Sequence, residues 1–272
     1  MNKFTKTPEG ISFSVPVNVL EKWNPKLKIQ NQVKAENIIE MFDVIGFDYW
    51  DEGITATSVS KRLKEIGSDN PVEVLINSGG GDMFEGLAIY NLLKEHKGQV
   101  TIKVVGLAAS AASVIAMAGD VRKVAKSSFF MIHNAWINAR GDRNDFLEFH
   151  DYLAPFDAAM GELYKDGSGQ KLADIVEWMN KETWFNGSEA VAKGFATELL
   201  EEEVIEEDNN EALAAIRQIE AIMRNAGMPR SKAKALVKEL KNNGTPSATV
   251  IEDTPSAILL SESVALATNL KK

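Results

Sequence analysis

The sequence of residues 72–118 is VEVLINSGGGDMFEGLAIYNLLKEHKGQVTIKVVGLAASAASVIAMA. It contains the same order of features twice: a short apolar run, a glycine-containing turn, and a segment with apolar or small residues at helical spacing. The apolar runs are Val72–Ile76 and Val100–Val105, and the second helical segment is Ala108–Ala118. Short apolar runs that alternate with helices are typical of buried parallel strands. The sequence therefore predicts βαβ units, an α/β fold with a parallel sheet and right-handed crossovers.

The same patterns predict further elements on both sides of this stretch. They are a strand at Ile38–Val44, a helix beginning near Thr55, strands at Val121–Ala125 and Phe129–Ile132, a long helix from Phe146 to Leu163, and helices at Leu172–Asn180 and Ser188–Gly194. The long helix is amphipathic, and its apolar side includes Phe149, Phe156 and Met160. Pro155 falls inside the long helix. Because proline lacks an N–H and clashes with the preceding turn, we expect a kink there.

Composition divides the chain into a globular part and a C-terminal extension. Between Glu198 and Glu211 there are eight acidic residues and no basic one, and self-repulsion keeps such a run solvated. Two helical segments follow, and then a tail in which polar residues, glycine and proline interrupt short apolar runs. We expect an N-terminal arm or strands at 1–30, one globular domain at 31–198, an acidic linker at 199–210, a helical extension at 211–241 and a flexible tail at 242–272.

Composition also excludes several classes of protein and site. The chain is 44% hydrophobic and 25% charged, and it lacks both a secretion signal and an apolar run of about 18 residues, so we expect a cytoplasmic protein that does not enter membranes. The absence of cysteine excludes disulfides, thiolate nucleophiles and cysteine-ligated metals. The net charge of -9 argues against non-specific binding to nucleic acid, which needs a basic surface.

Ser110 and His133 are the candidate catalytic residues. Ser110 lies where an apolar run passes into a helix, so its hydroxyl can be exposed while nearby N–H groups receive a developing oxyanion. Taken alone, Ser110 is more simply interpreted as a helix cap. His133, however, follows the strand Phe129–Ile132, and strand ends are where parallel sheets place their functional residues. Since histidine is the usual base for a serine nucleophile, the pair favours covalent catalysis.

The glycine run Gly79–Gly81 precedes a helix, as a phosphate-binding loop does. It lacks the lysine and the hydroxyl residue of a Walker loop and the glycine spacing of a dinucleotide fingerprint. The other interpretation is that glycine lets a backbone N–H point into a site while an extended peptide lies alongside.

Three blocks together resemble the signature of the Clp protease proteolytic-subunit family. They are Ile76–Gly81, Gly106–Ser110 and Met131–His133, in the family's order and spacing. The resemblance extends from about Ile38 to Glu198. It implies a crotonase-like fold of repeated ββα units and a homo-oligomeric ring that encloses the active sites.

The resemblance also implies a serine protease site that needs neither metal nor cofactor. Its residues would be Ser110 as nucleophile, His133 as general base, the N–H groups of Gly81 and Ala111 as oxyanion hole, and Gly79 and Gly80 as the backbone that binds substrate. The third catalytic residue is aspartate in the family, and this chain has Glu182 there. We expect the Glu182 carboxylate to accept a hydrogen bond from Nδ1 of His133.

Other blocks resemble the phage-encoded branch of the family. They are Gly86–Asn91, Ala116–Asp120 and Glu182–Trp184, together with the helical extension. Members of that branch are taken to be head maturation proteases, which cleave scaffold and capsid proteins. The resemblance thus implies a serine endopeptidase, ATP-independent or assisted by an unfoldase, in the host cytoplasm or inside a procapsid.

Two other functions are compatible with the same residues. A catalytically inactive assembly or scaffold protein would use the acidic linker and the basic helices for binding. A crotonase-type acyl-CoA enzyme would share the backbone oxyanion hole, but it gives no reason for Ser110 and His133 to occur together.

Overall fold

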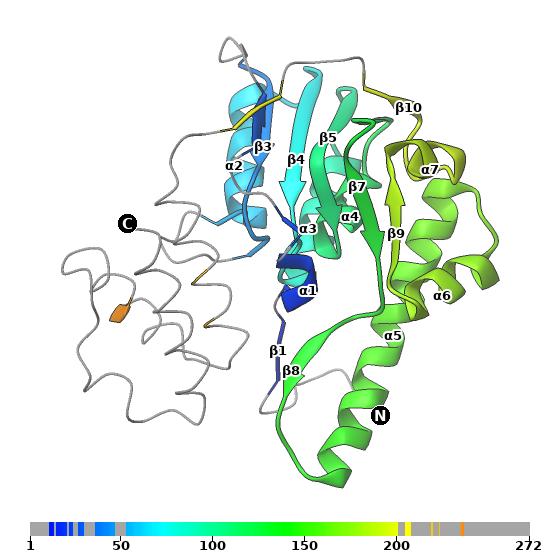
Figure 1. Cartoon of the computed structure of the whole chain (residues 1–272). Helices are drawn as coiled ribbons and strands as arrows, with labels where there is room; N and C mark the ends of the chain where they lie inside the picture. Colours follow the sequence, from blue (N-terminus) through cyan, green and yellow to red (C-terminus); the bar gives the residue numbers. More distant parts are fainter. Residues whose placement is uncertain are drawn as a thin grey trace, which may run out of the picture.

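The structure is a computed structural model of the whole chain (Figure 1). It describes residues 11–13, 15–20, 22–23, 27–29, 36–46, 53–200 and 205–207, with Ile219, Met223, Ala235 and Leu236. In these ranges no helix has the length and apolar character needed to cross a membrane.

A seven-stranded sheet forms the centre of the molecule. Its strands are β3 (Ile38–Met41), β4 (Val72–Ser78), β5 (Val100–Ala109), β6 (Val121–Val124), β7 (Phe129–Ile132), β9 (Thr183–Asn186) and β10 (Glu198–Leu199). The order is β10-β6-β5-β4-β3, with β7 beside β5 and β9 beside β7. All pairs are parallel except β7 with β9. The predicted α/β fold with a mainly parallel sheet is confirmed.

Strand β5 changes its neighbour along its length. Its first part, Thr101–Val104, pairs with β6, and its last part, Leu107–Ala109, pairs with β7. The sequence interpretation ended this strand at Val105 and began the helix at Ala108, which is wrong. Because Leu107–Ala109 bond to β7, the strand continues to Ala109 and the helix begins at Ala111. This brings the end of β5 next to the end of β7.

Helices cover one face of the sheet. They are α2 (Ala56–Ile66), α3 (Met83–Lys94), α4 (Ala111–Ala116), α5 (Arg143–Ser168), α6 (Leu172–Asn180) and α7 (Gly187–Ala192). Capping side chains fix where they begin: Thr55 accepts a hydrogen bond from the N–H of Ser58, and Asp82 accepts from two N–H groups at the start of α3. Side chains such as Val74, Ile76 and Ile89 fill the layer between sheet and helices. This layer is the main hydrophobic core.

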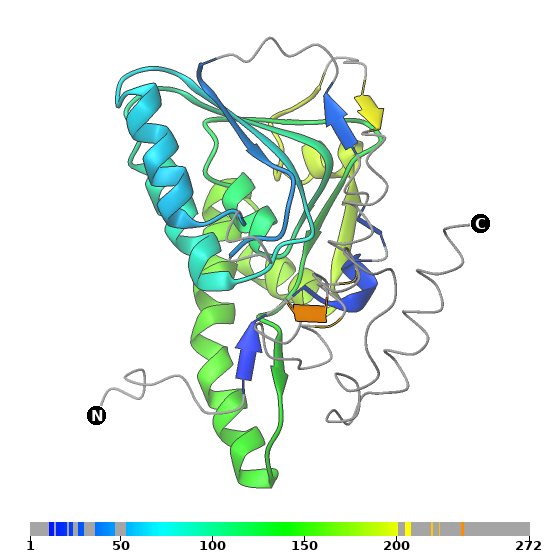
Figure 2. The same cartoon turned by 90° about the vertical axis from the view of Figure 1, so that its left-hand side faces the viewer.

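Helix α5 projects beyond the body of the molecule, as Figures 1 and 2 show. Pro155 lies inside it, yet the helix runs continuously from Arg143 to Ser168. The proline therefore does not end the helix.

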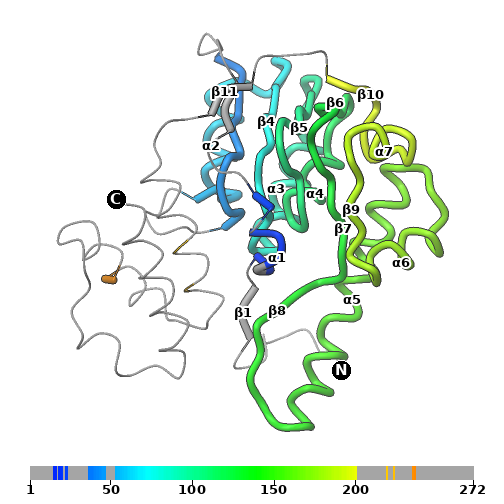
Figure 3. Tube along the Cα trace, viewed as in Figure 1, coloured from blue at the N-terminus to red at the C-terminus, as the bar shows by residue number. Residues whose placement is uncertain are grey.

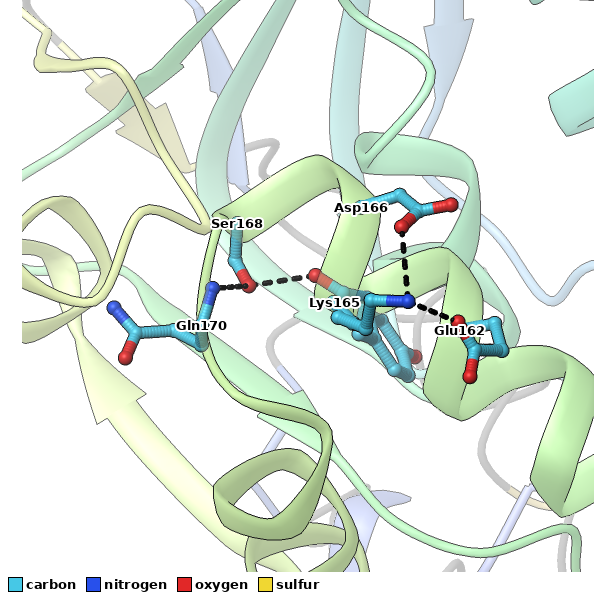
Figure 4. A network of polar contacts seen from close by, with 6 residues as sticks. Glu162, Lys165, Asp166, Ser168 and Gln170 are labelled. Atoms are coloured by element: carbon cyan, nitrogen blue, oxygen red, sulfur yellow. Dashed lines mark hydrogen bonds and ion pairs between the residues drawn. The ribbon is translucent and has the colours of Figure 1, made fainter.

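The C-terminal end of α5 is held by local contacts. Figure 4 shows the polar side chains there, which are Glu162, Lys165, Asp166 and Ser168 on the helix and Gln170 just after it. The Ser168 hydroxyl donates to the carbonyl of Tyr164, and Gly169 adopts φ 72° and donates its N–H to the carbonyl of Lys165. A left-handed glycine of this kind is a common helix terminator. The last turn, from which Tyr164 reaches the core, is thereby fixed.

The N-terminal part contributes two strands and a short helix. Strand β1 (Ile11–Phe13) pairs with β8 (Ile137–Ala139), and β2 (Leu27–Ile29) pairs with β11 (Ile205–Glu207), both antiparallel. Helix α1 (Val17–Leu20) lies at the end of the sheet where β4, β5 and β7 finish (Figures 1 and 3).

The structure bears on the expected acidic linker at 199–210 and on the expected helical extension at 211–241. Part of the expected acidic linker, Ile205–Glu207, is the strand β11, because its backbone pairs with β2. The expected helical extension at 211–241 lies outside the described residues except for four positions in it, of which Met223 and Leu236 are buried. The expected tail at 242–272 lies wholly outside them.

Candidate active site

Ser110 stands between the end of β5 and the start of α4 in a strained backbone conformation. Its φ is 54° and its ψ is -126°. A side chain other than glycine is rarely found there, and such strain persists only where the surrounding structure imposes it. Here the Ser110 N–H donates to the carbonyl of Met131 on β7, at 3.1 Å. Pairing of β5 with β7 thus sets the position of the Ser110 hydroxyl.

His133 follows β7 and faces Ser110. Its Nε2 lies 2.7 Å from the Ser110 Oγ, which is hydrogen-bonding distance. The His133 side chain is only 7% exposed. Burial lowers the pKa of His133 from its ordinary 6.5 to about 4, although the nearby negative charge of Glu182 acts in the opposite direction. At neutral pH the imidazole is therefore uncharged and able to accept a proton.

Glu182 lies close to this pair but does not bond to it. Its Oε1 accepts hydrogen bonds from Asn18 Nδ2, at 2.5 Å, and from Trp184 Nε1, at 3.3 Å. In the described part of the chain no hydrogen bond joins Glu182 to His133, which differs from the bond to Nδ1 that we expected. Asn18 and Trp184 hold the carboxylate oxygen instead. Glu182 acts on the imidazole through its charge.

Ser110 and Glu182 share one unusual property. Among the described residues they are the two non-glycine residues with positive φ, at 54° for Ser110 and 49° for Glu182. Backbone strain of this kind clusters at functional sites.

The glycine loop lies directly against Ser110. A Cβ added at Gly80 would come 2.7 Å from the Cβ of Ser110 and 2.6 Å from the carbonyl oxygen of Ala109. One added at Gly81, where φ is 149°, would come 2.1 Å from the carbonyl oxygen of Ile45. Any larger residue would collide with backbone, so glycine is required at both positions.

Two backbone N–H groups in this loop and helix have no partner within the described ranges. They belong to Gly81 and to Ala111, the first residue of α4. First-turn N–H groups of a helix have no acceptor inside the helix, and the Gly81 loop is tied down on either side of its own N–H by bonds to Ile45. Both donors border the same pocket as Ser110 and His133. They are available to an oxyanion.

A small pocket, largely apolar in its lining, opens beside Ser110. Its lining residues are Gly81, Met83, Ser110, Ala111, His133, Asn134, Ala135, Trp136, Met160 and Tyr164. The structure thus brings four of the expected site residues together, whereas Glu182 lies outside the pocket. Sequence reasoning missed Met83 and Tyr164 as site residues. Helical spacing placed Met160 and its neighbours on the buried face of α5, but it gave no indication that this face meets Ser110.

Ser113 bonds to the backbone of Ser110. It is fully buried, and its hydroxyl donates to the carbonyl of Ser110 at 2.6 Å and bonds to the Tyr164 hydroxyl at 2.7 Å. Burial raises the pKa of the Tyr164 hydroxyl. Ser113 is thus occupied by structural bonds and is not a second nucleophile.

No group of three His, Asp or Glu side chains suited to a metal ion occurs in the part of the chain that the structure describes.

Comparison with known proteins matches residues 27–203 to the family model described as Clp protease. The chain is 27% identical over 156 residues to the ATP-dependent Clp protease proteolytic subunit 1 of Salinibacter ruber, and 30% identical over 129 residues to the proteolytic subunit of Ligilactobacillus salivarius. These matches cover 57% and 47% of this chain and 65% and 66% of the two relatives. The chain therefore spans about two thirds of the length of these relatives.

The fold is also found among solved structures. A ClpP1 mutant from Listeria monocytogenes superposes with a TM-score of 0.52 at 23% identity, over 61% of this chain and 92% of that one. At this identity the likeness concerns the fold.

Proposed function

Because the chain belongs to the Clp protease family, we propose that it is a serine endopeptidase whose nucleophile is Ser110 and whose general base is His133. The observation that carries this proposal is the 2.7 Å contact between Ser110 Oγ and a buried imidazole whose pKa lies near 4. A base in that state takes the hydroxyl proton as the oxygen attacks a carbonyl carbon.

The geometry supports an acyl-enzyme reaction in two halves. Ser110 Oγ attacks the scissile carbonyl while His133 Nε2 takes its proton, and the carbonyl oxygen becomes an oxyanion that the N–H groups of Gly81 and Ala111 stabilise. His133 then gives the proton to the leaving amine, and the C–N bond breaks. A water molecule attacks the acyl-enzyme with His133 again as base, which releases the acid and restores Ser110.

The pocket beside Ser110 supports an apolar preference in the substrate. Met83, Met160 and Tyr164 line it. Burying an aliphatic side chain there contributes to binding in proportion to the apolar area removed from water. We propose that the residue whose carbonyl is attacked carries a small apolar side chain.

The role proposed for Glu182 is to stabilise the imidazolium through its charge. Glu182→Gln keeps the shape of the side chain and an oxygen that can accept from Asn18 and Trp184, but it removes the negative charge. We expect kcat to fall by about 100-fold, because the imidazolium that forms during the reaction loses a nearby opposite charge. The loss should be smaller than the roughly 10⁴-fold effect seen where the carboxylate bonds Nδ1 directly. Single-turnover hydrolysis of a peptide ester measures it.

Glu177→Gln provides the matched control. Glu177 is also an acidic residue close in sequence, on α6, but it is exposed and paired with Lys181, so its loss should leave kcat unchanged. Normal kcat in the Glu182 variant would make the site a Ser-His dyad.

The pH dependence of kcat/KM provides a second test. His133 must be uncharged to act as base, and its pKa is about 4, so activity should be constant from pH 8 down to about 5 and fall below that. Glu182→Gln removes the charge that raises this pKa, so its acid limb should shift to lower pH. A wild-type acid limb centred near 6.5 would show that His133 is not buried in the active enzyme.

The biological setting proposed is capsid maturation in a phage-infected cell, with scaffold or capsid proteins as substrates. It rests on the resemblance of three sequence blocks and the C-terminal extension to the phage-encoded branch. A homo-oligomeric ring is supported by exposed apolar side chains on the projecting end of α5, Phe146 at 53% and Leu147 at 61% exposure. Digestion of a folded protein without ATP would establish that no unfoldase is required.

Labelling of Ser110 separates these proposals from the alternatives. A small fluorophosphonate reacts only with an activated serine. We expect a single adduct on the peptide containing Ser110, located by mass spectrometry. An inactive assembly protein or an acyl-CoA enzyme would give no adduct.

A further inference from the structure

An extended substrate needs a free backbone edge near Ser110. Proteins commonly bind extended peptides by adding them as a strand to an exposed edge, because the backbone bonds supply affinity for any sequence. Two such edges adjoin the site: the loop Gly79–Gly81, and the segment that leads from His133 through Asn134 and Ala135 into β8.

The second of these edges is already occupied by the chain's own N-terminal part. Strand β1 pairs antiparallel with β8 in the register Ile11 with Ala139, Ser12 with Asn138, and Phe13 with Ile137. Figures 1 and 2 show β1 running beside β8 from the projecting end of α5 toward the ends of the central strands. If this register continued, Val15 would stand opposite Ala135, which lines the Ser110 pocket.

Val15 also covers the first edge. A Cβ at Gly79 would come 3.1 Å from Cγ1 of Val15 and 3.3 Å from Cγ1 of Val19, and Val15 itself is only 2% exposed. Strand β1 thus lies along the edge of β8, and Val15 lies against the glycine loop. This is the path that an extended substrate would follow to reach Ser110.

Within the described residues, the firmest anchor of this segment lies on its C-terminal side. Beyond Val15, helix α1 is held by burial of Val19, Leu20 and Trp23 and by a bond of 3.0 Å from Trp23 Nε1 to the carbonyl of Asn77. Strand β1 is held by its three-residue pairing with β8 in a two-stranded sheet. A short pair of this kind is only marginally stable, so β1 can leave β8 while α1 stays in place.

We propose that β1 is an internal occupant of the substrate-binding edge, and that it must leave β8 before a peptide can pair there and reach Ser110. This inference rests on the proposed peptidase function. In the resting chain the Ser-His pair is formed but the peptide path is closed. A small reagent that needs no backbone edge should still reach Ser110.

A reversible cross-link tests the proposal in the full chain. The protein has no cysteine, so Ser12→Cys with Asn138→Cys introduces one pair at opposed positions. Opposed Cα atoms of antiparallel strands are about 4.5–5.5 Å apart, within the range that a disulfide spans. In the oxidised protein we expect Ser110 to react with a small fluorophosphonate as in the reduced protein, while kcat/KM for a hexapeptide falls about tenfold or more. Reductant should restore cleavage. Ser12→Cys alone, treated alike, is the control.

The other possible outcomes contradict either this inference or the proposed peptidase function. Equal peptide cleavage in the oxidised and reduced forms, loss of labelling together with cleavage on oxidation, or failure of the two cysteines to pair would overturn the inference. No labelling in any form, wild type included, would instead overturn the proposed peptidase function.

A second variant acts in the opposite direction. The double variant Ile11→Pro with Ser12→Pro removes the backbone N–H at two successive positions. In an antiparallel pair alternate residues bond to the partner strand, so one of the two prolines must remove a hydrogen bond between β1 and β8. Because β1 competes with substrate, KM should fall severalfold while kcat is unchanged. An unchanged or higher KM would contradict the proposal.

Discussion

Ser110→Ala is expected to lower peptide hydrolysis by about 10⁶-fold, the loss that removal of a serine nucleophile causes in related chemistry. Alanine can be held in the same backbone conformation by the same N–H bond to Met131, so the fold should persist. The hydroxyl contributes one bond, to His133, whose loss leaves the imidazole able to accept water from the pocket. Peptide turnover and fluorophosphonate labelling should disappear together, while the thermal unfolding midpoint changes little.

Ser113→Ala is the control for this result. Its hydroxyl bonds to the Ser110 carbonyl and to the buried Tyr164 hydroxyl, so the variant should lose about 1–3 kcal/mol of stability but keep the labelling of Ser110. The assignment is wrong if Ser113→Ala is inactive at a temperature where it is folded while Ser110→Ala retains turnover.

His133→Gln should also cost about 10⁶-fold in kcat, because the nucleophile and its base act as a unit. Glutamine can fill the site and bond the Ser110 hydroxyl, but it cannot take a proton. His150→Gln is the matched control, since His150 is exposed on α5 and contacts Asp151. Activity in the His133 variant within tenfold of wild type would remove His133 from the mechanism.

The same variant should change how stability depends on pH. The folded-state pKa of His133, about 4, lies below the unfolded value near 6.5, so the unfolded chain binds a proton first as pH falls. The contribution of neutral His133 is fully present above about pH 6.5 and is lost as pH falls toward 4, a change of up to about 3 kcal/mol. Between these values the unfolding free energy of wild type should therefore decrease more steeply than that of His133→Gln. Parallel curves would contradict a buried, neutral His133.

The pairing of Ser110 with His133 could be predicted because both follow apolar strands of a parallel sheet, and such strand ends meet at one edge. The position at which β5 ends could not be predicted from the sequence. Gly106 indicates a turn after Val105, and only the register with β7, which depends on a distant segment, extends the strand to Ala109.

The hydrogen-bond partners of Glu182 could not be predicted from the neighbouring sequence either. Its carboxylate is held by Asn18, which is 164 positions away in the sequence and lies outside the matched family region. Helical spacing identified the buried side of α5 that includes Met160, yet which pocket that side lines depends on how α5 packs against α4. Contacts between distant segments leave no periodic trace in the sequence.

The change of neighbour along β5 has a consequence for the newly made chain. Ser110 acquires its strained conformation and its contact with His133 only when Leu107–Ala109 pair with β7, which is made after β5. β7 in turn pairs with β9, some fifty residues later, and Glu182 directly precedes β9. A polypeptide still emerging from the ribosome therefore lacks the geometry that the proposed reaction needs. On the proposed mechanism, the site is complete only after β7 and β9 have paired.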